Sequence, residues 1–107
     1  MTSPTRVILD PKREAEIVTL PFDFASKMQL PFNDVLSAPT TTVVVWSGVD
    51  PNPSAMLVST TASGSQVLPK VQGGIAGVIY LLKVVVQASL SGTLELDGLL
   101  AVLPAGM

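Results

Sequence analysis

The 107-residue chain contains no histidine and no cysteine. Without histidine it has no side chain that ordinarily titrates between about pH 5 and 8, and it lacks the commonest general base and metal ligand. Without cysteine, disulfide bonds, thiolate nucleophiles and cysteine-ligated zinc sites are excluded. The serines have no histidine to activate them, and no phosphate-binding glycine loop is present. We therefore expect a protein that is not an enzyme, with no catalytic residue, no cofactor and no metal site.

Charged side chains are also scarce. They make up 13% of the sequence, whereas a soluble domain usually carries about a quarter. Apart from the pair Lys12 and Arg13, the six basic residues are scattered, so no basic patch predicts nucleic-acid binding. Hydrophobic residues make up 48% of the chain, and a monomer with so few charges is prone to associate. The composition favours an assembled state, such as a homo-oligomer.

No apolar run is long enough to suggest a membrane span. The longest, residues 75–86, contains Lys83 and is shorter than the roughly 20 apolar residues that a spanning helix needs. Its valine-rich composition is typical of β-strands. The N-terminus has no apolar core of the kind found in signal peptides. We expect no contact with a membrane.

Short β-type segments separated by turn residues run through the sequence, and no helical period is sustained. This pattern predicts one all-β antiparallel sandwich of about seven strands. Residues 1–12 are expected to form an N-terminal arm and residues 13–107 the sandwich domain. One helical turn is expected over residues 25–30, where Pro31 would end it. The expected strands cover residues 6–9, 14–24, 40–46, 55–61, 66–71, 78–88 and 93–103.

A glycine-rich turn precedes the most apolar strand. Gly73, Gly74 and Gly77 are expected to adopt positive φ in this turn. Tyr80 follows at the start of the strand, a place typical of a tyrosine corner, in which the hydroxyl bonds to nearby backbone. Gly92 belongs to the tight turn between the last two strands. We interpret these five residues as structural.

The last two strands are apolar on both faces. On the 78–88 strand the uninterrupted face is expected to be the core, and its members are Val78, Tyr80, Leu82, Val84, Val86 and Ala88. The second face predicts contact with a partner, although cover by other parts of the same chain remains an alternative. Burial is worth about 1.5–3 kcal/mol per large apolar side chain, against association costs of about 4–15 kcal/mol. The predicted contact residues are Ile79, Leu81, Val85, Leu99 and Leu103.

Several further residues carry definite expectations. Phe22 and Trp46 are expected to anchor the core, and Gly98 to introduce a bulge that resets the strand register. The substitution Leu81→Asp, like Val85→Asp, is expected to block assembly while the monomer stays folded.

The acidic pairs Glu14/Glu16 and Glu95/Asp97 each share one strand face. They suit a carboxylate pair or a cation site, but a solvated strand face is the simpler interpretation. The residues around Asp50 are similarly ambiguous, because Asp50-Pro51-Asn52 resembles part of a calcium loop but lacks the following ligands. A turn is the simpler interpretation.

Three groups of residues together resemble small Ig-like structural proteins of tailed bacteriophages, of the fibre–tail adaptor type. These groups are Glu14…Phe22-Asp23-Phe24-Ala25 with Leu30 and Asp34, then Gly73-Gly74-x-x-Gly77-x-x-Tyr80-x-Leu82, then Ser89-x-Ser91-Gly92-x-Leu94-Glu95.

The resemblance implies an Ig-like sandwich in the virion, assembled in the host cytoplasm. Such an adaptor would join tail or neck and fibre components through apolar sheet faces and an N-terminal arm. Its partners would be other virion structural proteins. A capsid-decoration protein, a head–tail connector or a carbohydrate- or surface-binding Ig-like module are the alternatives.

Overall fold

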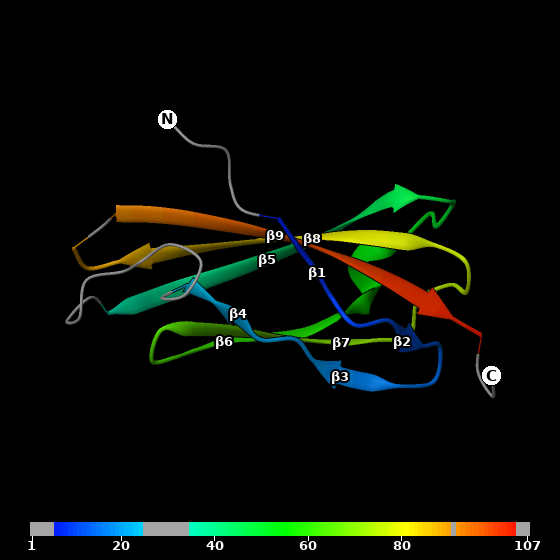
Figure 1. Ribbon diagram of the computed structural model, residues 1–107, viewed down its shortest axis with the longest axis horizontal. Coiled ribbons are helices and arrows are strands. Elements are labelled where there is room, and N and C mark those ends of the chain that lie inside the picture. Colours follow the sequence, from blue (N-terminus) through cyan, green and yellow to red (C-terminus); the bar gives the residue numbers. More distant parts are fainter. Residues whose placement is uncertain (1–5, 25–34, 91, 105–107) are drawn as a thin grey trace.

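The computed structural model describes residues 6–24, 35–90 and 92–104. Two β-sheets face each other within these residues, and the described part of the chain measures 43 × 26 × 21 Å (Figure 1). The helical turn expected over residues 25–30 and the tip of the N-terminal arm lie outside the described residues. The elements are β1 (Arg6–Ile8), β2 (Lys12–Arg13), β3 (Ile17–Thr19), β4 (Phe22–Asp23), β5 (Leu36–Ser47), the short 3-10 helix η1 (Pro53–Met56), β6 (Leu57–Ser63), β7 (Gln66–Gln72), β8 (Ile79–Ala88) and β9 (Gly92–Leu103).

The first sheet has the order β1-β9-β8-β5, and β2 pairs with β9 beyond β1. In the second sheet β7 pairs with β6 on one side and with β3 and β4 on the other. β1 and β2 both pair with β9, and β3 and β4 both pair with β7, so each of these two pairs occupies one strand position in its sheet. We call each strand position a lane, and the sandwich then has four lanes in the first sheet and three in the second. Figure 1 shows β9, β8 and β5 in the upper layer and β6, β7 and β3 in the lower.

This arrangement confirms the predicted all-β, Ig-like sandwich of about seven strands, which the described residues form as nine strands in seven lanes. In chain order, the third, sixth and seventh lanes (β5, β8 and β9) lie in the first sheet, and the second, fourth and fifth (β3 with β4, β6 and β7) form the second sheet. An Ig-type domain divides its third, sixth and seventh strands from its second, fourth and fifth in the same way. One feature differs from a purely antiparallel arrangement, because β1 and β2 run parallel to β9. Residues 6–8, within the predicted arm, therefore belong to the sheet.

The core lies between the sheets and confirms the face predicted for β8. Core side chains alternate along β8, as expected for a strand that covers a core. Phe22 packs among the core side chains and is 1% exposed, which confirms it as a core anchor. The fully or nearly fully buried residues include Phe22, Phe24, Val67, Val71, Tyr80, Leu82, Val84, Val86, Leu96, Leu100 and Val102.

Trp46 is not a core residue, so that prediction is wrong. The Trp46 side chain is 51% exposed. The pairing of β5 with β8 shifts between Val45, opposite Tyr80, and Ser47, opposite Ile79. Val43 and Val45 lie opposite the core residues Leu82 and Tyr80. Alternation along β5 therefore turns the next residue, Trp46, away from the core.

Gly98 does not form a bulge, so the predicted change of register in β9 is also wrong. The pairing of β8 with β9 is continuous from Ile79 opposite Ala101 to Ala88 opposite Gly92. Gly98 lies opposite Leu82 and faces the second sheet. A Cβ atom at Gly98 would lie 2.8 Å from Cζ of Phe22, so the glycine makes room for the Phe22 ring.

The single strand predicted over residues 14–24 is instead divided. β3 and β4 are separated by Leu20 and Pro21, in keeping with the difficulty of placing proline inside a strand. The segment before β3 is a turn, in which the main-chain N–H of Arg13 donates to the Glu16 carboxylate at 2.7 Å. Likewise η1 occupies the beginning of the strand predicted over residues 55–61.

Candidate interaction surface

The five predicted contact residues share the outer face of the first sheet. Ile79, Leu81 and Val85 are the apolar members of β8 that alternate with its core residues. Leu99 and Leu103 occupy the corresponding positions on β9, since Leu81 lies directly opposite Leu99 and the intervening core positions Leu100 and Val102 are buried. The outer face of β8 and β9 is therefore where the candidate surface lies.

A polar row divides this outer face. Thr42 on β5 lies opposite Lys83 on β8, which lies opposite Asp97 on β9. On one side of the row lies a group that we call the apolar half, consisting of Val44, Ile79, Leu81, Leu99, Ala101 and Leu103. On the other side, Val85 lies between Thr40 and Glu95. Four of the five predicted contact residues thus fall together, and Val85 is separated from them.

A shallow hollow opens in the apolar half. It has a volume of about 250 Å³ and is lined by Leu9, Pro11, Ile79, Leu99 and Ala101. The chain between β1 and β2 forms one wall, held to β9 by a hydrogen bond from the Leu9 N–H to the Leu99 carbonyl at 2.9 Å. Small-molecule sites usually occupy about 300–1,000 Å³. The hollow is smaller than this range.

The chain itself covers one of the predicted contact residues. Leu81 is only 5% exposed, because it lies between Val44 on β5 and Leu99 on β9. Ile79, Leu99 and Ala101 are partly exposed, and Leu103 is 39% exposed. The accessible part of the apolar half is therefore formed by the residues around Leu81 rather than by Leu81.

At one end of the sandwich, Tyr80 forms the predicted tyrosine corner. Its side chain is fully buried, and its hydroxyl oxygen accepts a hydrogen bond from the Ile75 N–H at 2.9 Å. The hydroxyl donates to Asp50 Oδ2 at 2.7 Å. Burial, followed by the hydrogen bond to Asp50, raises the pKa of the Tyr80 hydroxyl.

Both carboxylate oxygens of Asp50 accept hydrogen bonds from other residues of the chain. Oδ2 accepts from Tyr80, and Oδ1 accepts from the Asn52 N–H at 2.9 Å, closing a turn. These contacts favour the turn interpretation of Asp50-Pro51-Asn52 over a calcium loop.

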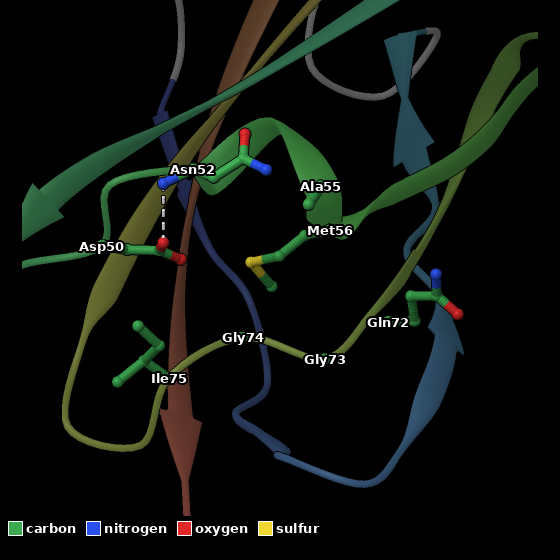
Figure 2. A pocket seen from close by; sticks show the side chains of 8 residues that line it. All are labelled: Asp50, Asn52, Ala55, Met56, Gln72, Gly73, Gly74 and Ile75. Carbon is green, nitrogen blue, oxygen red and sulfur yellow. Dashed lines mark hydrogen bonds between the residues drawn. The ribbon is translucent and has the colours of Figure 1, made fainter.

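An open pocket of about 460 Å³ lies beside this corner (Figure 2). The loop before η1 faces the segment that follows β7, and the Met56 thioether points into the space between them. Asp50 is the only charged residue among the lining residues, and its carboxylate is already hydrogen-bonded. We assign no ligand to this pocket. The lining residues are Asp50, Asn52, Ala55, Met56, Gln72, Gly73, Gly74 and Ile75.

The predicted turn glycines all have positive φ, at 65° for Gly73, 95° for Gly74, 88° for Gly77 and 86° for Gly92. Gly74 is also required by a close approach, because a Cβ atom there would lie 2.9 Å from Cγ2 of Val102. The φ angles agree with the conformation expected for these glycines.

Lys12 is a buried cation that sequence reasoning missed. Its side chain is 1% exposed, and Nζ donates to the carbonyl oxygens of Arg13 at 2.6 Å and Gly73 at 2.5 Å. These bonds tie β2 to the loop after β7. Burial lowers the pKa of Lys12, partly opposed by the negative charges of Glu16 and Glu14. No sequence pattern distinguishes Lys12 from its exposed neighbours, because its partner Gly73 is distant in the chain.

The acidic pairs do not come together. Asp97 is 8% exposed and lies opposite Lys83 in the β8–β9 pairing, whereas Glu14 and Glu16 lie in the turn between β2 and β3. Across residues 6–24, 35–90 and 92–104, no three histidine, cysteine, aspartate or glutamate side chains are grouped to hold a metal ion. Over the same residues no helix is sufficiently long and apolar to span a membrane.

Comparison of the sequence with protein-family models and with curated proteins found no match. The fold and the surface define a class: an Ig-like β-sandwich with a half-apolar outer sheet face.

Proposed function

We propose that this chain is a non-enzymatic structural protein that binds a neighbouring protein through the apolar half of its outer sheet face. The observation that supports this most strongly is the hollow beside Ile79 and Leu99, walled on its other side by Leu9 and Pro11. Side chains in such hollows often dominate the binding energy of a protein interface. The polar row through Lys83 limits this surface on one side.

The magnitudes are compatible with a persistent contact. Each large apolar side chain gains about 1.5–3 kcal/mol when it passes from full exposure to full burial. Ile79 and Leu99 are already partly covered, so each contributes less than that value. A partner side chain inserted into the hollow adds a comparable gain. Association is opposed by about 4–15 kcal/mol, so several such contacts acting together are required.

The particular role we propose is that of a tailed-phage virion protein, an adaptor that joins tail or neck and fibre components. The resemblance of the sequence to fibre–tail adaptors supports this proposal. A low content of charged residues, 13%, and an Ig-like sandwich suit a component that works in an assembly. The partners would be other virion proteins and further copies of the chain.

The interface is tested with Ile79→Glu and Leu99→Glu, each of which places a carboxylate beside the hollow. Thr93→Glu is the matched control, because Thr93 is exposed on the same face beyond the polar row. Sedimentation velocity at several concentrations should show weaker association for both variants in the apolar half and unchanged association for the control. Equal association of all three proteins would place the interface elsewhere.

The virion role needs a separate test. Mass spectrometry of purified phage particles that carry this gene should detect the chain at a fixed ratio to the other particle proteins. Its presence only in the soluble fraction of the lysate would contradict the virion role and leave the interface unaffected.

One observation favours a second function, a carbohydrate-binding module. Trp46 is 51% exposed, and exposed aromatic rings are the usual stacking surface for sugars. Glycan-array binding that is lost in Trp46→Ala would support this function, and absence of binding by the unmodified chain would exclude it for the glycans tested.

A further inference from the structure

One side of the sandwich is almost free of charge. Residues 35–69 contain a single charged side chain, that of Asp50, and its carboxylate is hydrogen-bonded to the Tyr80 hydroxyl. This stretch forms β5, η1, β6 and the beginning of β7. Surfaces that stay in water normally carry mixed charges, so the uncharged side is a candidate for contact with another protein.

The uncharged stretch supplies the edge strands of both sheets on the same side of the molecule. β5 is the last strand of the first sheet, and β6 pairs only with β7 among the described strands. The two strands contact each other across the sandwich, where Thr60 Oγ1 donates to Thr41 Oγ1 at 2.9 Å. Figure 1 shows β5 in the upper layer and β6 in the lower.

β5 differs from the edge strands on the opposite side of the sandwich. There β1 and β3 have three residues each and β2 and β4 two each, and Pro21 interrupts the lane of β3 and β4. Short length, proline, bulges and charge are the usual protections of a sheet edge. β5 has twelve residues.

Only the ends of β5 carry such protection. Its pairing with β8 shifts between Ser37 and Thr40, next to Pro39, and again between Val45 and Ser47. Between these shifts, residues 40–45 pair with β8 in continuous register. Their sequence is three threonines followed by three valines, which are β-branched residues typical of strands. The outward main-chain groups of this stretch have no partner strand among the described residues.

We propose that β5 pairs edge to edge, antiparallel, with β5 of a second copy of this chain, so that two four-lane sheets become one. A twofold axis through residues 40–45 sets the strand against itself. Because this stretch is uncharged, self-pairing brings no like charges together. The outer-face residue Thr42 then lies opposite Thr42 or Val44 of the second copy. This contact uses the edge of the sheet, and Val44 is the one residue of the apolar half that lies in the pairing stretch.

The absence of cysteine from the chain permits a direct geometric test with single cysteines. The experiment uses the Ile79→Glu protein, in which contact through the outer face is weakened. Thr42→Cys is added as the probe, and Thr93→Cys, also exposed but at the far end of β9, is the matched control. Facing residues of antiparallel strands have Cα atoms about 4.5–5.5 Å apart, so a short bismaleimide should link Thr42→Cys chains about tenfold faster than Thr93→Cys chains.

A second variant tests the same edge by charge. In the double variant Thr40→Glu/Thr42→Glu, the glutamate at position 42 lies opposite Lys83 of the same chain, and this pairing of opposite charges should preserve folding. In the dimer, however, the two chains would bring four carboxylates together where the β5 strands meet. In the Ile79→Glu background the mass in solution should fall from twice 11.1 kDa to 11.1 kDa. Circular dichroism of the variant should remain that of the unmodified sandwich.

The edge proposal and the proposed function fail in different ways. An Ile79→Glu protein that is monomeric at every concentration, or equal cross-linking of the two cysteine probes, would overturn the β5 dimer. Association that is unchanged by Ile79→Glu but abolished by Thr40→Glu/Thr42→Glu would support the β5 dimer and contradict the proposed outer-face interface.

Discussion

The hydroxyl of Tyr80, at the beginning of β8, donates a hydrogen bond of 2.7 Å to Oδ2 of Asp50, in the loop that follows β5. The same hydroxyl accepts from the Ile75 N–H. One buried side chain therefore holds together the first sheet, the loop before η1 and the glycine-rich turn after β7. The loop and the turn contribute to the lining of the pocket in Figure 2.

Tyr80→Phe should lower the free energy of unfolding by about 1–3 kcal/mol, because the Ile75 N–H and the Asp50 carboxylate each lose a partner. Urea denaturation measures this change. The raised pKa of Tyr80 adds a pH dependence. Above the ordinary value of 10.0 the unfolded chain loses the proton first, so the contribution of Tyr80 is present below pH 10.0 and is lost as pH rises through the folded pKa. Tyr80→Phe should lack this alkaline loss. An identical alkaline slope in both proteins would contradict the assignment.

Lys12→Met should reveal a pH dependence of the opposite sign. Because the folded pKa of Lys12 is lowered from 10.5, the unfolded chain binds more protons between that lowered value and 10.5. The free energy of unfolding of the unmodified protein should therefore rise with pH in this window relative to Lys12→Met. Paired urea denaturation curves at increasing pH measure the difference. A difference independent of pH would show that the Lys12 amine titrates as it does in water.

Gly98→Ala should destabilise the sandwich by about 1–3 kcal/mol through overpacking, because the new methyl group would lie 2.8 Å from the Phe22 ring. Phe22→Leu creates space at the same point. In the double variant the added cost of Gly98→Ala should be smaller than in the unmodified protein, which a double-mutant cycle of unfolding free energies measures. Strict additivity would contradict a direct contact between the two positions.

Leu81→Asp should destabilise the monomer by roughly 2–5 kcal/mol, as expected for loss of a buried leucine together with burial of a carboxylate. The structure thus corrects the expectation that this substitution would affect assembly alone, because Leu81 is 5% exposed. Thr93→Asp, at an exposed site on the same face, should change stability by less than about 0.5 kcal/mol. Equal stability of the two variants would mean that Leu81 is accessible.

Local pattern was sufficient to predict much of the fold. The alternation along β8 identifies its core face, and the glycines before Tyr80 identify the turn and the corner, because these features depend on residues close together in the sequence. The grouping of Ile79, Leu99 and Leu103 on one outer face follows from the same alternation combined with a hairpin.

The remaining features depend on contacts between distant segments. The need for glycine at position 98 results from the Phe22 ring in the opposite sheet. The burial of Lys12 depends on the carbonyl of Gly73. The separation of Val85 from the apolar half needs the pairing of three strands. None of these relationships leaves a pattern in a short window of sequence.

The most direct test of the account is the mass of the unmodified chain in solution as a function of concentration. Sedimentation equilibrium should give a weight-average mass that rises above the 11.1 kDa of one chain as concentration increases. A mass that stays at 11.1 kDa up to about 1 mM, where even an affinity of about −4 kcal/mol would produce complexes, would contradict self-association through either surface.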